Sequence, residues 1–163
     1  MDNPGGLPPW RDTFKEDEND GEDWKINAKK AMAKDLYNQW GEVFSLLRAM
    51  FEIIKTSDEE PISAEMMEDQ KEMYLSDAYM VATKIQGAEA GDSYVIRMQN
   101  AAIIRQLASG IQSMTYGFFM EDPSSEEEIK IIREAITKFR MMFIEWVATF
   151  EKDEFEDEWG LFI

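Results

Sequence analysis

The segment from Ser93 to Met120 contains no aspartate or glutamate, although the chain has 34 acidic residues among 163 and a formal net charge of −17. Its only charged residues are Arg97 and Arg105. Much of the remainder is apolar or small, a composition typical of a helix that other helices surround closely. We therefore expect this segment to form the central helix of a helical bundle.

The spacing of apolar residues predicts four long helices, at about 24–55, 63–86, 93–120 and 124–152. Apolar positions recur every three or four residues, which is the period of one face of an α-helix. Short segments rich in glycine, proline, serine and acids separate the helices. The sequence therefore predicts an all-α fold, an up-down-up-down four-helix bundle. The clearest core positions are Ile26, Ala33, Leu36, Trp40, Val43, Leu47, Met50 and Ile54 in the first helix, and Ile129, Ile132, Ile136, Phe139, Phe143, Trp146 and Phe150 in the last.

Two acidic arms are expected to extend from the bundle. Residues 1–23 contain three of the five prolines, two adjacent glycines, and eight acids against two bases, which is typical of an extended arm. Residues 24–152 would form the bundle, and residues 153–163 an acidic and aromatic tail. Trp10 and Phe14 are the expected anchors of the first arm, either on the bundle or on a partner.

The composition argues against several kinds of chemistry. The chain has no cysteine and no histidine, so thiolate ligands, disulfides, the commonest metal ligand and the commonest general base are all missing. The acidic balance disfavours direct binding to nucleic acid or to an anionic membrane. Neither a signal peptide nor an apolar run of membrane-spanning length is recognisable. We therefore expect a cytoplasmic, non-enzymatic protein with no cofactor, no metal site and no catalytic residues.

Arg97 and Arg105 lie eight residues apart, about 12 Å along a helix axis and about 80° apart around it. In one interpretation each pairs with a carboxylate of a neighbouring helix, because an unpaired buried arginine is costly. Glu89, Asp92 and acids of the first or last helix would be natural partners. In the other interpretation both arginines clamp a small anionic ligand, with hydrogen bonds added by Asn100, Gln106 and Gln112.

A row of three methionines, Met66, Met73 and Met80, repeats every seven residues in the second predicted helix. It lies to one side of the predicted core stripe. Packing at the edge of the bundle would explain the row. A surface for a second copy or another protein is the alternative, because unbranched methionine side chains adapt to varied partners.

The end of the sequence combines a run of acids with apolar side chains, chiefly Trp159, Leu161 and Phe162. Such a segment suits a partner that has an apolar pocket and a basic rim, since the acids steer and the aromatic groups anchor. Alternatively, the three side chains fold back and cover the end of the bundle.

No motif identifies a family, so the function follows from surfaces alone. The leading hypothesis is a protein-interaction or scaffold bundle that acts through its arms and its methionine-edged face, with an unknown protein partner or a second copy of itself. One alternative is a binder or sensor of a small anionic ligand. Another is an acidic mimic of nucleic acid, although much of the acidity lies in the arms and not on the predicted helices.

Overall fold

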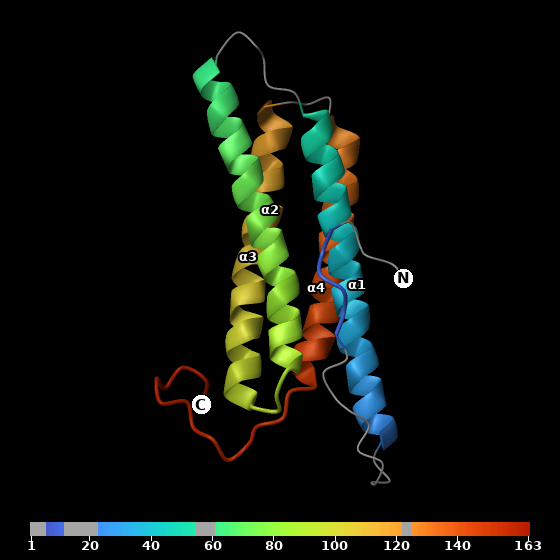
Figure 1. Cartoon of the computed structure of the whole chain (residues 1–163), viewed down its shortest axis with the longest axis vertical. Helices are drawn as coiled ribbons and strands as arrows, with labels where there is room; N and C mark the ends of the chain where they lie inside the picture. Colours follow the sequence, from blue (N-terminus) through green and yellow to red (C-terminus); the bar gives the residue numbers. More distant parts are fainter. Residues whose placement is uncertain (1–5, 12–22, 55–60, 122–124) are drawn as a thin grey trace.

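The computed structural model describes residues 6–11, 23–54, 61–121 and 125–163 (Figure 1). These residues form four α-helices and no strand, so the predicted all-α class is confirmed. The helices are α1 (Asp23–Ile53), α2 (Pro61–Glu89), α3 (Tyr94–Glu121) and α4 (Glu126–Ala148).

The four helices lie side by side along the long axis of the molecule (Figure 1). Helix α1 packs on α2 and α4, and α3 packs on the same two helices. The contact between α3 and α4 is the least extensive of these four. Each helix therefore turns one face to a shared core and another to solvent.

The predicted apolar stripes form that core. Of the eight positions predicted for the first helix, the seven from Ala33 to Ile54 are buried, and the side chain of Ile26 lies outside the described part. Of the positions predicted for the last helix, the three isoleucines, Phe139 and Trp146 are buried, and Phe143 and Phe150 are half-buried. The rings of Trp40 and Phe139 lie 4.7 Å apart between centroids, and Trp40 Nε1 donates a 2.7 Å hydrogen bond to the carbonyl oxygen of Ala78. A large aromatic residue with a satisfied N–H thus joins α1 to both of its neighbours.

Two helix ends differ from the prediction. Helix α2 continues through Gly87 to Glu89, because the buried Glu89 carboxylate accepts a hydrogen bond from Trp146 Nε1 at 3.0 Å. This contact between distant segments extends the helix beyond a glycine that locally favours a turn. Helix α4 ends at Ala148, four residues earlier than predicted, where Thr149 Oγ1 donates to the carbonyl oxygen of Trp146 at 2.6 Å.

The prediction that Ser93–Met120 is a central, enclosed helix is wrong. Ala102, Gly110 and Gly117 are exposed, and a Cβ added to either glycine would meet no described atom within 4 Å. The physical reason is that four helices of similar length surround a common axis, so none is enclosed by the others. The absence of acids therefore characterises an exposed face of α3 and not a buried one.

The segment 6–11 packs along α1 (Figure 1). The Leu7 side chain is only 1% exposed, and the Trp10 and Tyr37 rings lie 5.3 Å apart between centroids. Tyr37 donates its hydroxyl hydrogen to the carbonyl oxygen of Pro8, and Gln86 Nε2 donates to that of Pro9 at 3.2 Å. Trp10 therefore anchors this segment on the bundle. Phe14, the other expected anchor, lies outside the described residues.

Candidate functional site

The C-terminal segment 151–163 begins on the bundle surface and then loops away from it (Figure 1). Its first part is attached at two points. Lys29 Nζ lies 3.2 Å from Glu151 Oε1, and Asp153 Oδ2 accepts a 2.8 Å hydrogen bond from the backbone N–H of Tyr94, at the start of α3. These contacts hold the base of the segment against the helix ends.

The second part of the segment is a turn organised by one carboxylate. Asp157 Oδ1 accepts the backbone N–H of Trp159 at 3.1 Å, and Oδ2 accepts those of Leu161 and Phe162 at 2.9 and 3.0 Å. Gly160 donates to the Asp157 carbonyl oxygen and has φ of +67°, which favours glycine. Hydrogen bonds from the Phe162, Trp159 and Leu161 amides lower the pKa of Asp157, because they stabilise its ionised form.

We call residues 159–163 the C-terminal tip. Its side chains project into solvent, with Trp159 94%, Leu161 73% and Ile163 92% exposed, while Phe162 is half-buried. The alternative in which Trp159, Leu161 and Phe162 all cover the end of the bundle is therefore wrong for Trp159 and Leu161, while the half-buried Phe162 leaves it open for that side chain. The Asp157 carboxylate already satisfies three backbone amides of the turn, so those amides need no partners on the bundle.

Arg97 takes part in a polar cluster at the junction of α2, α3 and α4. Its Nη2 atom lies 3.8 Å from Glu89 Oε2 and 3.9 Å from Asp92 Oδ1. The guanidinium also lies 5.4 Å from the centroid of the Phe150 ring, and Nε donates to the Gly91 carbonyl oxygen at 3.3 Å. The predicted pairing with Glu89 and Asp92 is present, which explains how this arginine can be largely buried. The same prediction is wrong for Arg105, which forms no ion pair with any described residue and is exposed, so it needs no carboxylate partner.

The two arginines considered for an anionic ligand do not converge on one site. Arg97 lines a cavity of about 410 Å³ near the base of the C-terminal segment. Arg105 is exposed and lines a different cavity, of about 250 Å³, together with Gln112. Asn100 Nδ2 donates to the Ile96 carbonyl oxygen on its own helix, at 2.9 Å. The approximate 80° between the two arginines accounts for their different surroundings.

The methionine row lies on the solvent side of α2. Met66, Met73 and Met80 are 59%, 49% and 44% exposed. Thr83 Oγ1 lies 3.6 Å from the Met80 sulfur, a weak contact within the same helix. The row is therefore an accessible strip of polarizable side chains beside the core.

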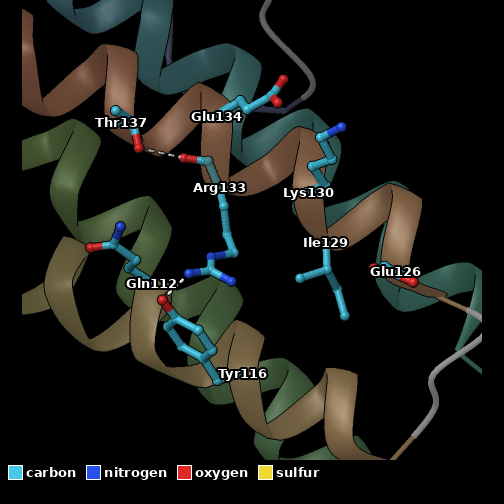
Figure 2. Close-up of a pocket in the computed structure, with 8 residues that line it drawn as sticks. All are labelled: Gln112, Tyr116, Glu126, Ile129, Lys130, Arg133, Glu134 and Thr137. Atoms are coloured by element: carbon cyan, nitrogen blue, oxygen red, sulfur yellow. Dashed lines mark hydrogen bonds between the residues drawn. The ribbon is translucent and has the colours of Figure 1, made fainter.

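A further cavity, which the sequence did not indicate, lies between α3 and α4 and measures about 580 Å³ (Figure 2). The Arg133 side chain crosses from α4 to the Tyr116 ring on α3, with its guanidinium carbon 3.7 Å from the ring centroid (Figure 2). This cation–π contact ties the two helices together. Residues 17 positions apart on different helices leave no sequence pattern by which their pairing could have been found.

Comparisons with known proteins do not identify the kind of site. Comparison with protein-family models, curated proteins and solved structures found no match for this chain. Among the described residues, no three acidic side chains are grouped so that they could hold a metal ion. None of the helices, within the same residues, is both long enough and apolar enough to cross a membrane.

Proposed function

We propose that the protein is a non-enzymatic interaction module whose principal binding element is the C-terminal tip. One observation carries this proposal: the Asp157 carboxylate holds an ordered turn that leaves Trp159, Leu161 and Ile163 largely exposed. Large apolar side chains in a preformed turn lose less conformational entropy on binding than they would in an unstructured tail. Tryptophan is also among the residues that most often dominate binding energy at protein interfaces.

The charges around the tip indicate the chemistry of its partner. Glu154, Glu156 and Glu158 precede the apolar side chains and are all exposed. Negative charge beside an apolar anchor accelerates association with a positively charged surface and rejects acidic surfaces. The expected partner therefore offers an apolar pocket with a basic rim.

The methionine row is the second surface in this proposal. Its position on α2 leaves it accessible, and flexible thioether side chains suit a protein contact. Met73→Glu would place a charge in the middle of the row. We expect it to weaken an interaction made by this face while leaving the fold intact, because Met73 is about half exposed. Unfolding of this variant would instead identify Met73 as a core residue.

We also infer that the four helices form an up-down-up-down bundle and that acidic arms extend from its N- and C-terminal ends. Support comes from the packing of each helix on its neighbours in sequence and from the short connections between them. In Figure 1 the end of each helix lies near the start of the next. This order leaves the α2–α3 connection and the end of α4 at the same end, next to the C-terminal segment.

Affinity capture from native cell extract tests the proposed function. The full chain, Trp159→Ala and Trp24→Ala serve as baits. Trp24 is a matched control, because it is also an exposed tryptophan, 68% accessible, but lies on α1. We expect Trp159→Ala to capture at least tenfold less of the partner than the full chain does, and Trp24→Ala to capture as much. Equal capture by all three baits would contradict the role of the tip.

A further inference from the structure

An apolar groove with an arginine on each side lies between α3 and α4. Buried or half-buried side chains form its floor, chiefly Ile104 and Ala108 from α3 and Ile136, Phe139 and Phe143 from α4. Arg105 and Arg140, both exposed, stand at its edges. We call this the α3–α4 groove. It occurs where the packing between neighbouring helices is least extensive.

The positive charges of Arg105 and Arg140 are not balanced by a carboxylate among the described residues. In the described part of the chain, neither Arg105 nor Arg140 forms an ion pair. Helix α3 has no acid before its final residue, and the positions three and four residues from Arg140 are isoleucine, threonine and phenylalanine. No acidic residue lines the groove either. A protein of net charge −17 therefore carries a locally positive apolar groove.

The size of the groove indicates its occupant. Its volume of about 250 Å³ falls below the roughly 300–1,000 Å³ of most small-molecule sites. One or two large apolar side chains would fill it, and the arginines would then lie beside the residues that flank them. A peptide that combines an aromatic anchor with carboxylates meets both requirements.

The C-terminal segment of this same chain has that chemistry. Its tip carries Trp159 and Leu161, and three glutamates lie within the five residues before Trp159. Within one copy, the tip does not occupy the groove, since Trp159 is 94% exposed and the base of the segment is tied to Tyr94. One molecule therefore carries both the tip and a groove of complementary chemistry, and the two are not in contact within that molecule.

We infer that the α3–α4 groove receives the C-terminal tip of a second copy, with Trp159 on its apolar floor and the flanking glutamates beside Arg105 and Arg140. This inference rests on the proposed function, because it names the partner of the same tip. Reciprocal exchange of two tips would give a dimer with two identical contacts, the commonest symmetry of homo-oligomers. Both contacts would cooperate, because the second forms within one assembled pair.

Complementation between two defective variants is the decisive test. The tip variant is Trp159→Ala, and the groove variant combines Arg105→Glu with Arg140→Glu. The control combines Lys34→Glu with Lys138→Glu, which alters the net charge equally at exposed sites that do not line the groove. Circular dichroism melting verifies that each variant is folded. Sedimentation equilibrium of each variant, alone and mixed, then measures association.

We expect the wild-type chain and the lysine control to dimerise. The tip variant and the groove variant should each associate at least tenfold more weakly. Mixing these two variants should give a heterodimer held by one of the two contacts, because one variant supplies an intact groove and the other an intact tip. This heterodimer should be weaker than the wild-type dimer but tighter than the association of either variant alone. Salt alone would not discriminate, since it screens both this attraction and the repulsion between two acidic copies.

Three results would overturn the inference. They are a wild-type chain that stays monomeric up to millimolar concentration, a groove variant that dimerises as well as the wild type, and a mixture that associates no more tightly than either variant alone. The capture experiment separates this failure from that of the proposed function. A monomeric chain whose tip still captures a different protein would retain the proposed function and lose the second copy as partner. A tip that neither dimerises nor captures any protein would contradict both.

Discussion

The two terminal arms, residues 1–23 and 151–163, both combine acids with tryptophan and other apolar residues. Their described parts differ in whether these apolar side chains pack on the bundle. In the segment 6–11, Leu7 is 1% exposed and Trp10 packs on Tyr37, whereas in the C-terminal segment Trp159 is 94% exposed. The difference shows that an aromatic residue in an acidic arm does not by itself predict whether the arm docks.

Hydrogen bonding explains which segment docks. Backbone carbonyls of the segment 6–11 accept hydrogen bonds from two side chains of the bundle, Tyr37 and Gln86. Backbone amides of the C-terminal segment bind Asp157 within the same segment. Each segment also uses a glycine at positive φ, Gly6 at +104° and Gly160 at +67°. A segment that satisfies its own backbone can remain in solvent with its apolar side chains available.

The largest expected effect on stability is at Arg97, close to the point where the C-terminal segment leaves the bundle. Arg97→Ala should lower the free energy of unfolding by about 3 kcal/mol, because it removes one member of the buried Arg97–Glu89 ion pair. Arg105→Ala, on the exposed part of the same helix, should change it by less than about 0.5 kcal/mol. Urea denaturation followed by circular dichroism measures both. Equal stability of the two variants would mean that the Arg97–Glu89 pair contributes nothing.

The next prediction compares the docked and displayed apolar anchors directly. Leu7→Ala should destabilise the protein by about 2–3 kcal/mol, because it removes a buried side chain and leaves a cavity. Trp159→Ala should change stability by less than about 0.5 kcal/mol, although it removes the larger side chain. Thermal and urea unfolding measure both. A destabilised Trp159→Ala variant would show that the tip packs on the folded chain.

A smaller effect is expected at the hydroxyl group that holds the segment 6–11. Tyr37→Phe should cost about 1 kcal/mol, the typical net contribution of one hydrogen bond, because the Pro8 carbonyl oxygen loses its donor. Burial raises the pKa of Tyr37 above its ordinary value of 10.0, so the hydroxyl remains a donor at neutral pH. Tyr79→Phe, on the exposed part of α2, is the control. Hydrogen exchange of the segment 6–11 should accelerate only in Tyr37→Phe.

The smallest effect is confined to the turn and depends on pH. The pKa of Asp157 lies below its ordinary value of 3.8, so the carboxylate stabilises the turn above that pH and loses this effect as the pH falls through the lowered pKa. Amide NMR shifts of Trp159, Leu161 and Phe162 should therefore stay constant from about pH 7 to 5 and change in more acidic solution. Asp157→Asn, which cannot ionise, should abolish this acid transition. A transition unchanged in Asp157→Asn would assign it to another group.

The helices and their core were predictable because their signal is local. Positions such as Leu36, Trp40 and Val43 recur with the helical period, and each is buried. One of the two interpretations of the arginines, pairing with carboxylates such as Glu89 and Asp92, is confirmed for Arg97, since a buried guanidinium requires a carboxylate close to it. It is wrong for Arg105, because the sequence does not show which side of α3 is exposed. The sequence identified Trp159 and Leu161 as binding candidates, but it left open whether they contact a partner or fold back onto the bundle.

The sequence by itself determined the number of helices, their approximate bounds and the residues that face the core, because spacing along one helix decides these properties. Only the tertiary structure decided that one face of α3 is exposed, that Leu7 docks while Trp159 does not, and that Arg105 and Arg140 flank one groove. These properties depend on which side chains of different segments meet. Arg105 and Arg140 lie 35 residues apart, and it is the packing of α3 beside α4 that places them at one site.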